Sequence, residues 1–178
     1  ITVTVTFNEN VIVDNSSGNP RIQLETGTND RYADYISGNS TNILSFLYTV
    51  RSGDNSSVLD YKSTDSLSAN SSNIRDNATN NATLTLTSPG ASGSLGANKS
   101  IVVDGIVPTV TNVSSSTDNG SYTLNDNITV TVTFNENVIV DNSSGNPRIQ
   151  LETGSNDSYA NYISGNSTNI LSFLYTVR

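Results

Sequence analysis

The chain lacks several side chains on which enzymes and redox proteins depend. Its 178 residues include no cysteine, no histidine, no methionine and no tryptophan. Without cysteine there is no disulfide or thiol chemistry, and without histidine there is no side chain that ordinarily titrates near neutral pH. A serine or cysteine nucleophile activated by histidine is therefore excluded, as is a thiolate or imidazole metal site. These absences predict that the chain is not an enzyme.

Charge is also scarce. Only 13% of the residues are charged, and 8 Lys and Arg stand against 16 Asp and Glu, for a net charge of −8. Nucleic acid is excluded as a partner, because binding it requires basic side chains that neutralise a row of phosphates. No apolar run approaches the roughly 20 residues that span a bilayer, so we expect no membrane insertion in this segment.

What the sequence does have is a long internal repeat. Residues 1–51 and 128–178 are identical except at three pairs of positions: Thr28/Ser155, Arg31/Ser158 and Asp34/Asn161. Residue 1 of one copy corresponds to residue 128 of the other, so the period is 127 residues, the size of one domain. We expect the chain to be a window from a longer tandem array.

Hydrophobic periodicity predicts strands and no helices. In residues 1–7, apolar side chains alternate with Thr2, Thr4 and Thr6, which is typical of a half-buried strand with a solvated threonine face and no pocket on that face. Similar short runs are separated by clusters of Gly, Asn, Asp, Ser and Pro. They lie at residues 22–24, 44–50, 82–86 and 101–103. The sequence therefore predicts an all-β fold, an antiparallel β-sandwich.

A domain boundary is predicted at residues 104–108. An apolar run ends at Asp104, and Gly105 follows. Pro108 then opens a new run, and no counterpart of this run occurs earlier in the chain. On this register, residues 1–107 form a domain that lacks its first strand, and residues 108–178 form the N-terminal part of the next domain. Each incomplete domain would expose an unpaired sheet edge.

An ordered set of motifs resembles a known family. The motifs are Val-Val-Asp-Gly-Ile-Val-Pro-Thr-Val at 102–110, the run at 120–138, Pro-x-Ile-x-Leu-x-x-Gly at 20–27 and Leu-x-Phe-x-Tyr-Thr-Val at 44–50. Together they resemble the bacterial Ig-like repeats of giant surface adhesins, in particular the cyanobacterial swimming-protein-like repeats. The resemblance implies an extracellular Ig-like β-sandwich at the cell surface, repeated in tandem as a stalk or filament segment.

Three acidic residues are candidates for a metal site. Glu9, Asp104 and Asp126 fall at predicted strand ends or near the predicted domain junction. Calcium takes 6–8 oxygen ligands and would stiffen such a junction. The alternative is that all three are solvated carboxylates in turns.

Asn-x-Ser/Thr sequences recur along the chain and could accept N-linked glycans. Those that fall in predicted surface turns are Asn15, Asn39, Asn55, Asn142 and Asn166. The alternative is ordinary turn chemistry, which also favours Asn followed by Ser.

Repetition itself favours a mechanical function, because length scales with copy number whereas a catalytic site gains little from being repeated in series. The expected partners are neighbouring repeats of the same polypeptide or identical chains. Two alternatives stay open. One is a glycan- or protein-binding module that gains avidity from its copies, and the other is a matrix or sheath subunit that assembles by adding strands at open edges.

Overall fold

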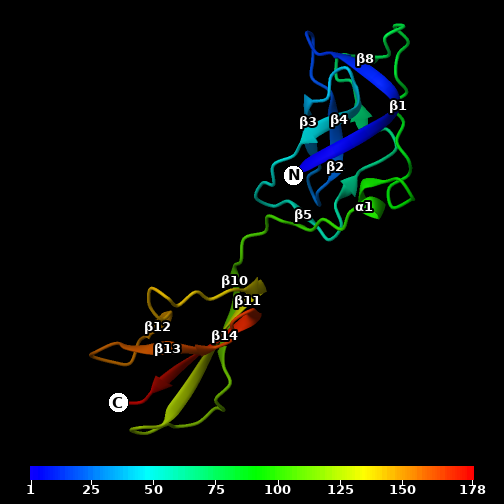
Figure 1. Ribbon diagram of the computed structural model, residues 1–178. Helices are drawn as coiled ribbons and strands as arrows, with labels where there is room; N and C mark the ends of the chain where they lie inside the picture. Colours follow the sequence, from blue (N-terminus) through cyan, green and yellow to red (C-terminus); the bar gives the residue numbers. More distant parts are fainter. The chain divides into compact units, whose positions relative to one another are not determined.

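The computed structural model describes residues 1–178, and the fold is all-β (Figure 1). Nearly half of the residues lie in antiparallel strands, and the only helix is the four-residue α1 (Leu95–Asn98). No helix of the chain is long and apolar enough to cross a bilayer. The chain divides into two compact units, Ile1–Val107 and Pro108–Arg178.

The first unit is built on one curled antiparallel sheet. Its strand order is β6-β2-β3-β4-β1-β8, with β7 also paired to β2, and β5 and β9 form a separate two-stranded sheet. The strands are β1 (Thr2–Asp14), β2 (Arg21–Glu25), β3 (Arg31–Ser37), β4 (Thr41–Leu47), β5 (Asn55–Ser56), β6 (Asp60–Tyr61), β7 (Leu67–Ser68), β8 (Asn73–Arg75) and β9 (Val103–Asp104).

The long strand β1 has two successive partners. Its first half pairs with β4 from Thr2↔Leu47 to Thr6↔Ile43, and residues 12–14 pair with β8. The register with β4 shifts between Thr6 and Val11. A bulge of this kind bends a strand, and it lets the second half of β1 leave β4 and reach β8.

The core of the first unit follows the period-2 alternation of the strands. Ile22, Leu24, Leu44 and Phe46 are each 0–1% exposed, while the residues between them are less buried. Tyr35 packs edge-on against Phe46, with ring centroids 6.0 Å apart. The alternation therefore positions one apolar face on each strand.

The second unit is a five-stranded antiparallel sheet in the order β10-β11-β14-β13-β12. Its strands are β10 (Val110–Ser115), β11 (Asn127–Val138), β12 (Arg148–Leu151), β13 (Ser158–Ser164) and β14 (Thr168–Thr176). Its buried core is smaller than that of the first unit: Val132, Ala160, Leu171, Phe173 and Tyr175.

The repeated segments have the same strand pairings. The β1–β4 pairing Thr2↔Leu47 has its counterpart in the β11–β14 pairing Thr129↔Leu174, and the register shift after Thr6 recurs after Thr133. The β2–β3 register recurs in β12–β13, and the β3–β4 register recurs in β13–β14, in both cases at residue numbers 127 higher. Three substitutions between the copies leave every one of these registers unchanged.

Candidate functional site: a groove beside β1

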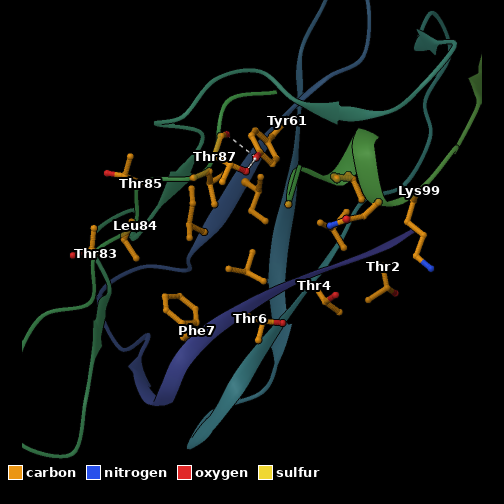
Figure 2. A pocket seen from close by; sticks show the side chains of 18 of the residues that line it. Thr2, Thr4, Thr6, Phe7, Tyr61, Thr83, Leu84, Thr85, Thr87 and Lys99 are labelled. Carbon is orange, nitrogen blue, oxygen red and sulfur yellow. Dashed lines mark hydrogen bonds between the residues drawn. The ribbon is translucent and has the colours of Figure 1, made fainter. Parts of the chain in front are cut away.

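A cavity of about 550 Å³ lies beside β1 in the first unit (Figure 2). One wall is the edge of β1 at residues 2–7, and the opposite wall is the segment 83–87. Side chains of the core, including Ile22 and Leu67, reach the cavity between these walls, and Lys99 lies at one end. We call this cavity the β1 groove.

The β1 wall is a free sheet edge. Residues 2–6 pair with β4 on one side, and no strand pairs with them on the other. The only other partner of β1 is β8, which pairs at residues 12–14. A free edge presents backbone N–H and C=O groups in the pattern that an added extended backbone can bond.

The opposite wall is extended but has no strand partner. Ala82 donates its backbone N–H to the carbonyl of Ile74 at 2.9 Å, and Leu86 donates to Thr64 at 2.8 Å. Between these two bonds, the backbone N–H groups of residues 83–85 have no acceptor in the chain. Leu84 and Leu86 are half-buried and alternate with exposed threonines. This wall therefore offers a second free edge.

The segment after the groove is tied to the sheet through β6. The hydroxyl of Tyr61 donates to the carbonyl oxygen of Thr87 at 2.7 Å and lies 2.9 Å from the Thr87 hydroxyl. The neighbouring Asp60 carboxylate accepts the backbone N–H of Gly90 at 2.9 Å. Because β6 pairs with β2, these bonds attach residues 87–90 to the sheet that contains β1.

The lining of the groove is mostly apolar or hydroxyl-bearing. Its lining consists of apolar side chains, hydroxyls and one amide, with Lys99 as the only charged residue. No carboxylate lines it, so the groove holds no pair of carboxylates that could act as general acid and base. What it offers is apolar contact and two free backbone edges.

The prediction of a threonine face without a pocket is wrong. Thr2, Thr4 and Thr6 are exposed, but all three line the β1 groove. Alternation along a strand determines the face on which a side chain lies. It does not determine whether another strand lies alongside, and here none does.

A buried carboxylate forms a second notable cluster, which the sequence patterns did not reveal. Asp54 is 0% exposed and accepts hydrogen bonds from the Tyr48 hydroxyl at 2.6 Å, Arg31 Nε at 2.7 Å and the Arg51 backbone N–H at 2.8 Å. Both carboxylate oxygens are thus engaged within the chain. The one signal of this cluster in the sequence is that its member Arg31 is replaced by Ser158 in the second copy.

The cluster perturbs the pKa values of its members. Burial alone would raise the pKa of Asp54, but the hydrogen bonds from Tyr48, Arg31 and Arg51 outweigh it, so the pKa of Asp54 is lowered. Burial, and then the bond to Asp54, raise the pKa of Tyr48 far above its usual value. Both groups therefore keep their ordinary charge states in the folded chain, and the cluster is a structural tie.

The three candidate metal ligands occupy separate local settings. Glu9 is exposed on β1, the Asp104 carboxylate accepts the backbone N–H of Ile106 at 3.1 Å, and the Asp126 carboxylate accepts that of Thr123 at 2.6 Å. No group of three or more His, Cys, Asp or Glu side chains that could hold a metal ion is present. Calcium at the junction stays a prediction.

The candidate glycan acceptors are all exposed: Asn15, Asn39, Asn55, Asn142 and Asn166. Two of them also shape the backbone. The side-chain oxygen of Asn39 accepts the Val13 N–H at 2.8 Å, and that of Asn166 accepts the Val140 N–H at 2.8 Å. The amide nitrogen, to which a glycan attaches, makes no bond to the chain in either residue. Glycosylation itself stays a prediction.

No protein-family model, no curated protein and no solved structure matches this chain. The resemblance to Ig-like adhesin repeats therefore stays an interpretation of the ordered motifs.

Proposed function

We propose that the chain is a structural segment of a long extracellular protein at the cell surface, in which Ig-like β-sandwich domains repeat every 127 residues. In this proposal, the repeats act as spacers in an adhesin stalk or as segments of a surface filament. Their partners are neighbouring repeats of the same polypeptide or identical chains.

The observation that carries this proposal is the near identity of the two copies, together with their shared strand pairings. Three differences in 51 aligned positions leave the β1–β4, β2–β3 and β3–β4 registers in place in the second copy. A spacer requires the same shape at each step, and its length grows with copy number. A catalytic site or a specific binding site does not require repeated copies of one shape.

The chemistry of the chain supports the same function. The β1 groove has no pair of carboxylates, and the buried Asp54 carboxylate is fully engaged by its own chain. The exposed side of β1 carries threonine, and the turns carry Asn, Ser and Gly. A surface of this kind stays hydrated and presents few charged or aromatic anchors for a ligand.

The test is to extend the chain by one and by two further 127-residue periods and to measure the maximum dimension by small-angle X-ray scattering. A strand of about 13 residues spans roughly 40 Å, so we expect a similar increment with each period. A maximum dimension that does not grow with the number of periods would contradict the spacer function. Saturable binding of one glycan to every copy in a glycan array would favour the binding module instead.

A further inference from the structure

The first unit is assembled from two segments, and one of them occurs twice in the chain. Residues 1–51 supply β1 to β4, and residues 52–107 supply β5 to β9 and the segment 82–87. Residues 128–178 repeat the first of these segments with three differences. Exchange between similar segments is a characteristic failure of repeat proteins, and a feature that distinguishes the copies prevents it.

Residues 52–107 join residues 1–51 through backbone pairing and a shared core. β6 and β7 pair with β2, and β8 pairs with β1. The buried cluster combines side chains of both segments, and residues 52–107 contribute Leu59, Tyr61, Leu67, Ile74 and Val103. Every residue that 1–51 contributes to this cluster is identical in 128–178. Apolar packing therefore does not distinguish the two copies.

Most polar contacts between the segments do not distinguish the copies either. Side chains of residues 52–107 bond to residues of 1–51 that are identical in the second copy: Asn19/Asn146, Asp30/Asp157 and Tyr48/Tyr175. The second copy therefore offers the same partners at these three positions.

One contact differs between the copies. Arg31 Nε donates to the buried Asp54 carboxylate at 2.7 Å, and the second copy has Ser158 in the place of Arg31. A serine hydroxyl carries no charge and cannot replace the guanidinium. The other two differences lie at Thr28 and Asp34, which are exposed and make no hydrogen bond or ion pair with residues 52–107.

We propose that Arg31 selects the copy that completes the first unit. Its ion pair with Asp54 favours residues 1–51 over residues 128–178, because the second copy would leave the buried Asp54 carboxylate without a counter-charge. A buried charge that loses its partner is strongly destabilising. Specificity of this kind comes from penalising the wrong partner, while the shared core and strand pairings stay available to both.

The chain is long enough for the second copy to compete. Residues 108–127 lead from the first unit to the second copy, and about 20 residues span roughly 65 Å when extended. The longest strand of the first unit, β1, has 13 residues and spans only roughly 40 Å. The link can therefore pass along the whole unit.

Both copies lie in this chain, so the choice between them does not depend on whether the repeats act as spacers. In a tandem array, a segment of the 52–107 type has one copy before it and one after it. The same choice therefore arises at every period.

Disulfide trapping tests the choice, because the chain has no cysteine of its own. Ile12 and Arg75 are cross-strand partners on β1 and β8, and Ile139 is the counterpart of Ile12. The reporter chain therefore carries Ile12→Cys, Ile139→Cys and Arg75→Cys. It is refolded from urea in a glutathione redox buffer. Mass spectrometry of tryptic peptides then measures whether the cysteine at position 75 is bonded to position 12 or to position 139.

We expect position 12 to hold this bond in large excess in the reporter chain. Adding Ser158→Arg should lower the excess at least roughly tenfold, because both copies then offer a guanidinium to Asp54. This variant keeps the Arg31–Asp54 pair, so the first unit retains all of its own contacts. Arg31→Ser together with Ser158→Arg should lower the excess further.

The other two differences between the copies provide matched controls. Ser155→Thr and Asn161→Asp each make the second copy identical to the first at a position that does not contact residues 52–107, so neither should change the ratio of the two bonds. In a reporter that also carries Asp54→Asn, Ser158→Arg should have a much smaller effect, because the buried charge is gone.

A ratio that Ser158→Arg changes no more than Asn161→Asp does would overturn the proposal. Equal bonding to positions 12 and 139 in the reporter chain would also overturn it, because Arg31 would then select nothing. A bond to position 139 that stays undetectable in every variant would show that the second copy does not compete.

Discussion

At the scale of single residues, Asp54 shows how a chain with few charges can bury one of them. An ionised carboxylate removed from water is strongly destabilising unless hydrogen bonds and an opposite charge offset the loss of hydration. Asp54 has both, since Tyr48 and the Arg51 N–H donate to one oxygen and Arg31 donates to the other. Arg31 is itself 26% exposed, so its own hydration is only partly lost.

Replacing this carboxylate should be costly. We expect Asp54→Asn to lower the free energy of unfolding by roughly 3 kcal/mol, because Arg31 loses its counter-charge and one of three donors loses its acceptor. Asp65→Asn is the matched control: Asp65 is exposed and makes no ion pair, so we expect a change within about 0.5 kcal/mol. Urea unfolding measures both, and equal effects would contradict the assignment of Asp54 as a structural tie.

The same residue predicts a dependence on pH. Because the pKa of Asp54 is lowered in the folded chain, its stabilisation is complete above the unfolded value of 3.8 and is lost as the pH falls through the folded value. The stability difference between the unmodified chain and Asp54→Asn should therefore shrink in acid. Asp14, Asp76 and Asp141 also have lowered pKa values, but they are present in both proteins and cancel in the difference. A difference that stays constant from pH 7 to acid would contradict this account.

At the scale of elements, the β3–β4 hairpin depends on one glycine. Gly38 has φ +111°, and a Cβ at this position would lie 2.1 Å from the carbonyl oxygen of Ile43. Its counterpart Gly165 has φ +109° and the same 2.1 Å contact with Ile170. The turn therefore requires glycine for two reasons, its left-handed backbone and its lack of a side chain.

We expect Gly38→Ala to destabilise the chain by at least about 1 kcal/mol more than Gly53→Ala. Gly53 is the matched control because its φ of +87° is also left-handed, but a Cβ there would meet nothing within 4 Å. The difference between the two variants isolates the steric contact from the backbone preference. Thermal or urea unfolding of both variants measures it, and equal destabilisation would show that the backbone preference alone matters.

The elements also show how far the sequence predicts the structure. The alternation in residues 1–7 and 44–50 predicts β1 and β4, because both bury one face against the same core. The same alternation at residues 82–86 predicts a strand, yet these residues pair with none. An alternating pattern reports which face is apolar, whereas a strand also requires a neighbouring backbone, and no local pattern reveals that neighbour.

The candidate site was less predictable for the same reason. The groove exists because two extended segments far apart in the sequence face each other without a strand between them. Asp54 and Arg31 are 23 residues apart, and neither stands in a recognisable motif. Short strands such as β5 and β9 depend on pairings between residues almost 50 positions apart, so propensity alone could not identify them.

At the scale of the whole molecule, the two units differ in how much core each one buries. Fourteen hydrophobic residues form the buried cluster of the first unit, and five form that of the second. The repeated strands are nearly identical in sequence, so the difference comes from residues 52–107, which add β5 to β9 and the segment 82–87 to the first unit alone. Stability rises with the apolar surface that a unit removes from water.

We therefore expect the chain to unfold in two steps, with the second unit unfolding at lower urea concentration. A matched pair of substitutions assigns the steps, since Phe46 and Phe173 occupy the same place in the two copies and are 0% and 5% exposed. Phe46→Ala should affect only the step at higher urea and lower its free energy of unfolding by about 3 to 5 kcal/mol, because Phe46 is fully buried in the larger core. Phe173→Ala should shift only the step at lower urea, and by less, because its smaller core leaves fewer contacts to lose. Circular dichroism during a urea titration measures both steps, and a single transition shifted equally by both variants would mean that the two units fold as one.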